Sequence, residues 1–429
     1  MSDTTEKTEA EATTPEPHER ETTDERGASI LRQVVGSNAA ISILAVVLAL
    51  ILSGILIAAT DPTVQSTAGY FFARPTDLFG AAWSSVSLAY TSIFQGAIIN
   101  FQAVGFAAAI TPLASTLNFA MPLIVAGLGV ALSFRTGMFN IGGQGQILIG
   151  AACAGWVGFS FDLPIGIHIP LAVIAGIVGG AFWGAIVGFL KARTGAHEVI
   201  VTIMLNYVAL YLISFMLRTP GLLQAKGSTN PQSPATLPSA ILPNPFGAHF
   251  PLSLGFLIVI AATFFVSWLL NRSSLGFRFR AVGENPHAAR TAGINVKNVY
   301  VWAMLISGAL IGIAGATQVL STLTTGFSSG IDAGIGFDAI TVALLGRSRP
   351  WGVFGAGILF GALKAGGYAM QAANGVPIDI VLVVQSLIVL FVAAPPLVRS
   401  IFRIPAPGAK PRPTRSAKAD SKKMAVVTK

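Results

Sequence analysis

Neutral amide side chains gather in one glycine-rich stretch of the sequence, FNIGGQGQ at residues 139–146. Asn140, Gln144 and Gln146 stand there among three glycines, between two apolar runs. Glycines permit a broken helix, whose free backbone groups can line a cavity in a membrane. Amides in apolar surroundings need partners, and because they both donate and accept they suit a neutral, hydroxyl-rich or heterocyclic solute. The stretch predicts either a solute pathway or amides that hold helices together.

A second polar set, Glu198, Thr202 and Asn206, recurs every four residues within HEVIVTIMLNY. This spacing places the three side chains on one face of a helix. We expect Asn206 near the middle of a membrane, as part of a solute pathway, and Glu198 near one end, as a gate or a contact with a partner protein. A hydrogen bond between helices is an equally good interpretation of Asn206.

A basic segment, 271–298, separates two long apolar runs and holds five bases against one acid. Asn285 can cap a helix, the proline after it suits the first turn, and Gly293 falls where a helix would stop. About two turns of helix are therefore expected between them. The small residues Ala288 and Ala289 form a face that would fit another protein. The alternative is a solvated loop whose arginines only orient the chain.

Several kinds of chemistry lack support in the sequence. No G-x-x-x-x-G-K-[ST] stretch is present, so the chain cannot hold ATP phosphates by that route. The letters GFSSG at 326–330 match a nucleophile elbow but lie in an expected loop without its strand–turn–helix context. The single cysteine, Cys153, and five scattered histidines support neither a disulfide within the chain nor a metal cluster. We expect no catalytic residue, metal or cofactor, and we expect Lys364, like Asp338 a charge at membrane depth, to pair or snorkel rather than catalyse.

The elements that must position these residues are membrane helices. Of 429 residues, 53% are hydrophobic and 10% charged, which is far from the composition of a soluble protein. Apolar runs predict an all-α integral membrane protein with about ten transmembrane segments, some of them broken or re-entrant. We expect 82–111 to form an external hairpin or a re-entrant piece, and 218–250 an external loop. The predicted segments are 38–59, 113–134, 138–159, 167–190, 199–217, 251–270, 299–320, a short broken helix at 337–346, 351–372 and 376–394.

The two chain ends differ from this transmembrane domain, 31–398. Residues 1–30 are acidic and 399–429 are basic, and both are predicted to be disordered cytoplasmic tails. The basic excess is expected to set topology and meet anionic lipid rather than nucleic acid. With the N-terminus in the cytoplasm, eleven bases of the domain fall inside and three outside, as the positive-inside rule requires. A cleaved signal peptide is not expected.

This orientation gives the segments of 113–217 and those of 299–394 opposite topologies. Two inverted-topology repeats with a pathway at their interface are therefore expected. A weak sequence similarity between the glycine-containing stretches 141–155 and 353–367 is consistent with such repeats. The alternative is that the similarity reflects only the high frequency of glycine in membrane helices.

Four stretches, FNIGGQGQ, EVIVTIMLNY, RAVGENPHAARTAGI and FDAITVALLGRSRPWG, resemble ABC-importer permeases of the ribose and branched-chain amino acid type. The likeness is nearest to the simple-sugar and nucleoside branch, covers roughly 110–395 and leaves out both tails. His197 departs from the small polar residue expected at its position. The resemblance implies a permease of a bacterial cell membrane, with both termini cytoplasmic, whose short helix docks on an ATPase. The residues assigned to this coupling are Gly283, Glu284, Asn285, Pro286, Ala288, Ala289, Arg290 and Gly293.

The resemblance also implies partners: a cytoplasmic ABC ATPase, an extracytoplasmic solute-binding protein or lipoprotein, and a second permease subunit. The expected pathway residues carry no charge, whereas a phosphorylated solute would require several Arg or Lys. Uncharged nucleosides are therefore the expected solute, with simple sugars as the alternative, and Phe139 or Tyr207 could stack on a base. An ion-coupled secondary transporter would need titratable groups in the membrane, and a membrane enzyme would need an acid/base or metal constellation. The predicted segments offer almost no titratable group besides Lys364 and Asp338, and the sequence holds no such constellation.

Overall fold

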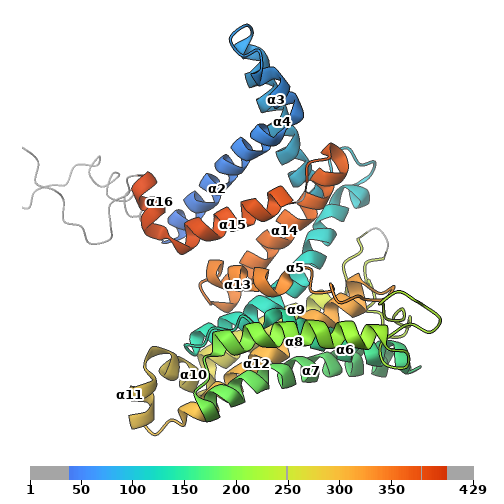
Figure 1. Ribbon diagram of the computed structural model, residues 1–429, viewed down its shortest axis with the longest axis vertical. Helices are drawn as coiled ribbons and strands as arrows, with labels where there is room; N and C mark the ends of the chain where they lie inside the picture. The colour runs from blue at the N-terminus through green and yellow to red at the C-terminus, as the bar shows by residue number, and fades with distance from the viewer. Residues whose placement is uncertain (1–37, 248–249, 378, 403–429) are drawn as a thin grey trace, which may run out of the picture. The chain divides into compact units, whose positions relative to one another are not determined.

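The computed structural model describes residues 38–247, 250–377 and 379–402, and this part of the chain consists of helices joined by loops (Figure 1). No strand is present in this part, and seven of its helices are long and apolar enough to cross a membrane. The predicted all-α membrane fold is confirmed, while the count of ten crossings stays a prediction. The helices are α2 (Asn38–Thr60), α3 (Pro62–Ala68), α4 (Pro75–Ala97), α5 (Phe106–Arg135), α6 (Gly143–Ser160), α7 (Ile165–Thr194), α8 (Glu198–Arg218), α9 (Gly255–Arg272), α10 (Ser274–Glu284), α11 (Pro286–Thr291), α12 (Val296–Thr317) with a π-helical end η1 (Gln318–Thr322), α13 (Ile335–Leu345), α14 (Pro350–Asn374), α15 (Asp379–Ala393) and α16 (Pro395–Ile401).

The chain divides into a large unit, 46–393, and a small unit made of its two ends. The contacts discussed below lie within the large unit. In the small unit, the start of α2 and helix α16 are described. The acidic tail predicted for 1–30 lies outside the described residues, and so do residues 403–429 of the basic tail predicted for 399–429. The start of that basic tail, up to Ile401, is not disordered but belongs to helix α16.

Two segments differ from the expectation. The hairpin or re-entrant piece expected over 82–111 is instead the continuous helix α4 followed by an early start of α5 at Phe106. The polar side chains that suggested an interruption, such as Gln95, line a cavity between helices and do not break α4. Helix α10 was also unexpected within 271–298, although Ser273 caps it by accepting from the Gly276 N–H at 2.9 Å.

The helices pack as two equivalent sets, α5–α8 and α12–α15. In this equivalence α5, α6, α7 and α8 correspond to α12, α13, α14 and α15. Helix α5 packs against α14, and its counterpart α12 packs against α7. Helix α6 packs against α12, and its counterpart α13 packs against α5. Helix α6 contacts α8 as α13 contacts α15, and the starts of α6 and α13 meet at Gly143 and Gly336. This pairing is the one expected of the predicted inverted repeats. The weak sequence similarity between 141–155 and 353–367 does not reflect these repeats, because it relates α6 to α14, whereas the packing relates α6 to α13.

Glycines bring the central helices into backbone contact. A Cβ added to Gly180 of α7 would lie 2.3 Å from the Gly308 carbonyl oxygen of α12, and one on Gly312 would lie 2.3 Å from that of Gly176. Helix α14 approaches α5 in the same way at Gly361, where a Cβ would lie 2.6 Å from a backbone oxygen. In lipid, packing rather than hydrophobic burial drives helix association, so small residues hold these crossings together.

Candidate functional site

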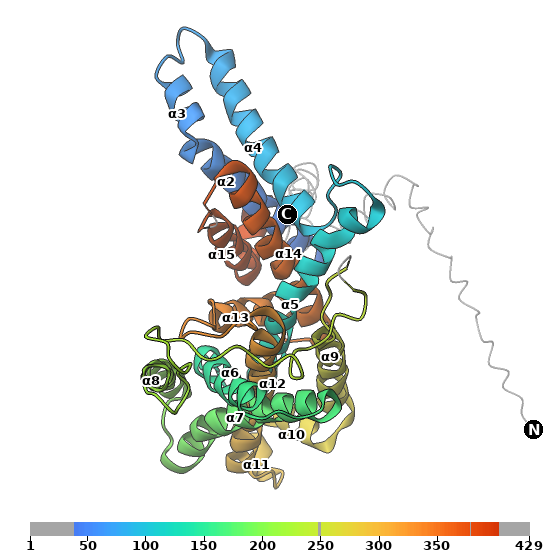
Figure 2. The same cartoon turned by 90° about the vertical axis from the view of Figure 1, so that its right-hand side faces the viewer.

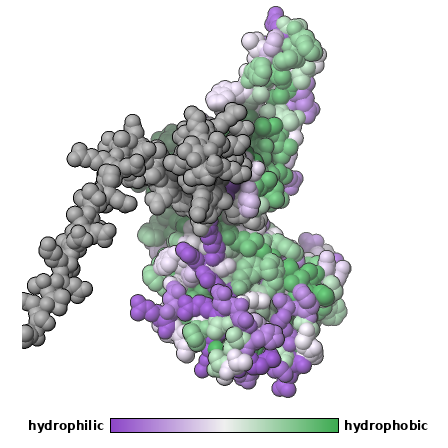
Figure 3. All heavy atoms as spheres, turned by 90° about the vertical axis from the view of Figure 1, so that its left-hand side faces the viewer, coloured by the Kyte–Doolittle hydropathy of each residue, from purple (hydrophilic) through white to green (hydrophobic). Residues whose placement is uncertain are grey.

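Helices α10 and α11 form a polar projection, and Figure 3 shows hydrophilic side chains over this region of the surface. The Asn285 side chain accepts from the backbone N–H groups of His287 and Ala288 at 2.9 and 3.0 Å. Gly293, with a φ of 80°, ends the segment, and the Ile294 N–H donates back to the Ala289 carbonyl at 3.0 Å. The predicted short helix, with its cap and its stop, is confirmed. Its exposed residues include His287, Ala288 and Arg290, and Glu284 at the end of α10 is exposed as well.

One side of α11 faces the chain itself. Ala289 is only 4% exposed and belongs to the same hydrophobic core as Phe279 and Val299, whereas Ala288 is exposed. The expectation that both alanines form a docking face is therefore wrong for Ala289. The reason is geometric: adjacent residues of a helix point about 100° apart, so one of the pair turns inward where α11 folds back on α10 and α12.

Helix α10 is fastened to the end of α5 by a backbone contact. A Cβ on Gly283 would lie 2.3 Å from the Arg135 carbonyl oxygen, so no side chain fits between the two segments. The Arg135 Nε in turn donates to the Ser348 carbonyl at 3.0 Å, in the turn between α13 and α14. Three elements meet at this point, and a displacement of α10 would be passed directly to α5.

The amides of the FNIGGQGQ stretch are buried where α6 begins. The Asn140 Nδ2 donates to the Ser307 Oγ at 2.9 Å and to the Gln146 Oε1 at 3.1 Å, while the Asn140 Oδ1 accepts from the Gly142 N–H at 2.9 Å. Ser307 donates onward to the Gly129 carbonyl at 2.7 Å. These bonds tie the start of α6 to α12 and α5.

Helix α8 also bonds to the segment where α6 begins. The Asn206 Oδ1 accepts from the Gly145 N–H, and its Nδ2 donates to the Ile141 carbonyl, both at 2.9 Å. Glu198 at the start of α8 pairs with Lys191 of α7. Asn140 and Asn206 thus bond to other helices, as the structural interpretation of these amides expected, and Gln146 bonds to Asn140. Gln144 is half-buried, and within the described residues its side chain makes no hydrogen bond.

A charged cluster occupies the corresponding place at the start of α13. Asp332 accepts from the N–H groups of Gly334 and Gly336 at 3.1 and 2.9 Å, much as Asn140 accepts from the residue two positions on. Six residues after Asp332, Asp338 pairs with the Lys364 Nζ of α14 at 2.7 Å. Burial raises the pKa of Asp332 to about 6, against its two hydrogen bonds and the Lys364 charge. Sequence reasoning expected Lys364 to pair or snorkel, without naming Asp338 as its partner, and it missed Asp332, whose signal was its position before a predicted half helix.

A polar cavity of about 690 Å³ lies between α4, α5 and α14, which pack side by side (Figure 2). Its size is that of a small-molecule site. The side chains that line it are neutral, and a smaller cavity of about 320 Å³ adjoins it at Ser115 and Phe119. Sequence reasoning missed this site, since Phe139 and Tyr207, the aromatic residues it named, do not line it. The polar and aromatic lining consists of Ser92, Gln95, Asn100, Gln102, Thr111, Ser115, Phe119 and Tyr368.

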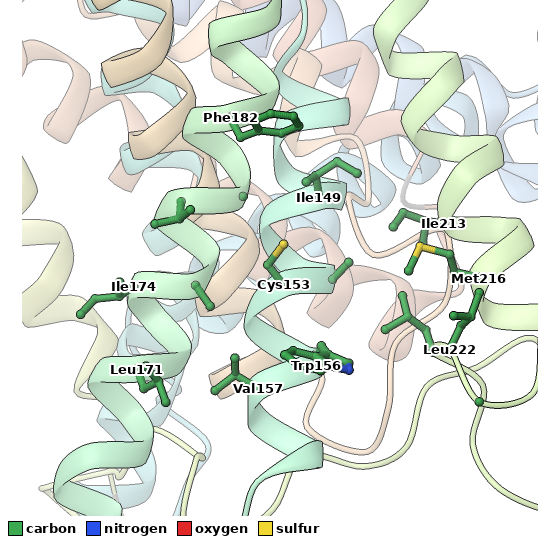
Figure 4. Close-up of a pocket in the computed structure, with 16 residues that line it drawn as sticks. Ile149, Cys153, Trp156, Val157, Leu171, Ile174, Phe182, Ile213, Met216 and Leu222 are labelled. Atoms are coloured by element: carbon green, nitrogen blue, oxygen red, sulfur yellow. The ribbon is translucent and has the colours of Figure 1, made fainter.

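A groove of similar volume, about 660 Å³, lies between α6, α7 and α8, but its lining is apolar (Figure 4). Side chains such as Ile149, Leu171 and Ile213 point into it, beside Cys153 and Trp156. A solute rich in hydroxyl or amide groups would lose its hydrogen bonds with water here and gain almost none in return. The cavity between α4, α5 and α14 is therefore the better candidate for a polar solute.

Comparison with known proteins places the chain in a family. The model of the branched-chain amino acid transport system / permease component matches residues 113–393. The guanosine ABC transporter permease protein NupP of Bacillus subtilis is 39% identical over 317 residues, which are 74% of this chain and 88% of that protein. The nucleoside ABC transporter permease protein NupB of Lactococcus lactis is 34% identical over 338 residues, 75% of this chain and 86% of that protein.

A third relative, the glucose ABC transporter permease protein TsgB13 of Haloferax volcanii, is 36% identical over 288 residues, 65% of this chain and 75% of that protein. No solved structure matches the chain. The family match spans both sets of helices, the α10–α11 projection and the α5 and α14 sides of the polar cavity. The chain belongs to the family of branched-chain amino acid transport system permease components.

Proposed function

We propose that this chain is the permease subunit of an ATP-binding-cassette importer that takes up nucleosides. The observation that carries the proposal is the connection made by α5. One end of this helix touches α10 at Gly283, and the other end lines the neutral cavity at Ser115. The 20 residues between Ser115 and Arg135 correspond to about 30 Å of helix, which is the thickness of a bilayer core. Movement of the α10–α11 projection would thus reach the cavity across the membrane.

In this proposal the projection faces the cytoplasm, as do both chain termini. The exposed side chains of His287, Ala288 and Arg290 contact a cytoplasmic ATPase, while Ala289 anchors α11 to its own subunit. A solute-binding protein or lipoprotein delivers the solute at the opposite end, and a second permease subunit, identical or different, completes the pathway. The names of the relatives, all of them ABC transporter permeases, support this division of labour.

The neutral lining supports an uncharged solute. A phosphate group would need cations or helix N-termini directed at it. Two relatives are named for guanosine and nucleosides, and one is named for glucose. A simple sugar is therefore the second candidate.

Gln144 is the residue of the FNIGGQGQ stretch that we retain as a direct contact with the moving solute. Asn140, Gln146 and Asn206 act on the pathway by holding the break at the start of α6 in place. Gln144→Leu should slow uptake and leave folded yield unchanged. Asn140→Leu should lower folded yield, because the Gly142 N–H loses its buried acceptor and the Ser307 hydroxyl loses its donor.

The proposed function is tested by competition. Cells that carry the complete transport system should accumulate labelled guanosine, and excess unlabelled nucleoside should block this uptake whereas the matching nucleotide should not. Purified permease with its ATPase should show ATP hydrolysis stimulated by nucleoside and binding protein together. Block by glucose but not by nucleosides would move the assignment to the sugar alternative. Block by a nucleotide would refute the neutral-solute argument.

A further inference from the structure

The polar cavity between α4, α5 and α14 contains side chains that the protein does not satisfy. Within the described residues, the side chains of Gln95, Gln102 and Ser115 and the hydroxyl of Tyr368 have no hydrogen-bond partner in the chain. Asn118 beside them is different, since it bonds to the 251–253 segment on both of its polar atoms. A polar group in a membrane protein costs free energy unless it is bonded, so these side chains must meet water or a ligand.

The cavity also contains a flat aromatic surface. The rings of Phe119 and Tyr368 stack with centroids 5.4 Å apart and planes 20° apart, which joins α5 to α14. Tyr368 is 51% exposed, so one face of this pair remains open. Phe119 lines both the main cavity and the smaller one next to it, and therefore stands at the passage between them. A planar heterocycle is the solute group that gains most from such a surface, because every base presents a π-face.

The surroundings of the cavity disfavour charge. Its lining holds no Asp, Glu, Lys, Arg or His. The cation nearest to the lining in the sequence is Lys364, which directly precedes the lining residue Ala365. Its ammonium group forms an ion pair with Asp338. A phosphate would thus lose its hydration without gaining a free cation, whereas a ribose and a base would lose only neutral hydrogen bonds that amides and hydroxyls can replace.

We propose that this cavity is the nucleoside-binding site of the permease, with the base on the Phe119–Tyr368 pair and its polar edge bonded by Gln95 and Ser115. The inference rests on the proposed function and adds to it the place and the chemistry of recognition. It also accounts for two polar side chains of α4, Ser92 and Gln95, which line the cavity.

The single cysteine of the chain makes a direct test possible. Cys153→Ser gives a cysteine-free background, and Ser115→Cys then places one thiol in the cavity. In cells with the complete transport system, we would measure the rate at which a charged methanethiosulfonate reagent modifies this thiol. Guanosine at ten times its dissociation constant should slow modification about tenfold, and guanosine monophosphate should not. Ser84→Cys, at an exposed position of α4 outside the cavity, should be modified at the same rate with or without nucleoside.

Uptake kinetics give a second readout. Tyr368→Leu removes the ring and should raise the KM for guanosine roughly tenfold or more. Tyr368→Phe keeps the ring and should raise it far less. Phe264→Leu is a matched control, because Phe264 pairs with Trp351 outside the cavity, and it should leave KM unchanged.

The outcomes separate this inference from the proposed function. If the wild-type system imports guanosine and yet guanosine protects no Ser115→Cys thiol, the site is wrong and the function stands. If glucose protects the thiol and guanosine does not, the nucleoside assignment fails for the site and for the transporter together. A Tyr368→Leu variant with unchanged KM and normal folded yield would overturn the stacking role.

Discussion

The ion pair between Lys364 and Asp338 gives the sharpest prediction about stability. Lys364 of α14 faces two carboxylates at the start of α13, with the Asp338 Oδ2 at 2.7 Å and Asp332 close enough for its charge to act on the Asp332 pKa. Lys364→Met removes the cation and leaves both acids in a largely buried place. We expect a marked loss of stability, because an unpaired buried carboxylate has neither water nor a countercharge.

The magnitude follows from burial. Removing one partner of a buried pair costs about 3–5 kcal/mol. The side chains of Lys364 and Asp338 are 14% and 20% exposed, so residual solvent should reduce this to roughly 2–3 kcal/mol. Unfolding entropy is about 2.1 cal/mol/K per residue, so in a chain of this length the loss corresponds to a drop in apparent Tm of roughly 2–3 °C.

The assay is thermal unfolding of the purified permease in detergent, at one scan rate and one pH. Lys364→Met combined with Asp338→Asn removes both charges and should recover most of the lost stability. Asp338→Asn alone should cost less than Lys364→Met, since Lys364 then keeps Asp332 as a countercharge. An unchanged Tm in Lys364→Met, or a double variant worse than the single one, would refute the role of this pair in joining α13 to α14.

Three further predictions follow from contacts elsewhere in the chain. Ala288→Glu should weaken stimulation of the ATPase in a stable permease, whereas Ala289→Glu should lower the folded yield of the permease itself, so equal effects in both assays would contradict the assigned faces of α11. Gly180→Ala places a Cβ 2.3 Å from a backbone oxygen and should reduce folded yield, while Gly166→Ala, with nothing within 4 Å, should not; size-exclusion profiles would show the difference. Burial raises the pKa of Asp332 from 3.8 to about 6, so the folded state holds this proton more tightly and its stability should fall as pH rises from about 4 to 6. Asp332→Asn should flatten that part of the Tm–pH curve, and a curve unchanged in shape would exclude Asp332 as the titrating group.

Features that depend on neighbouring residues could be predicted from the sequence. The α11 cap joins Asn285 to N–H groups two and three residues on, and the stop at Gly293 depends on one backbone angle. The long helices follow from the length of apolar runs, since a backbone in lipid must satisfy its own hydrogen bonds. The short helix α13 was recognised for the same reason, as a run too short to cross. Helix α10 was missed because its apolar residues are few and its segment is basic.

The function of individual polar residues depended on the tertiary structure. Asn140 has its interhelical partner Ser307 at a separation of 167 residues, so its sequence neighbours could not distinguish a structural bond from a solute contact. The cavity required α4, α5 and α14 to pack together, with Phe119 and Tyr368 in contact from distant helices.

The sequence by itself determined that the chain is helical, that it lies in a membrane, and where its short capped helix begins and ends. The tertiary structure decided which side of each helix is buried, exposed or turned toward a cavity: Ala289 is buried and Ala288 is not, and Gln95 faces a cavity. The physical reason is that lipid and protein core are both apolar. In a soluble protein an apolar stripe marks the buried face of a helix, but in a membrane helix an apolar residue fits either environment, so only the packing of the other helices selects between them.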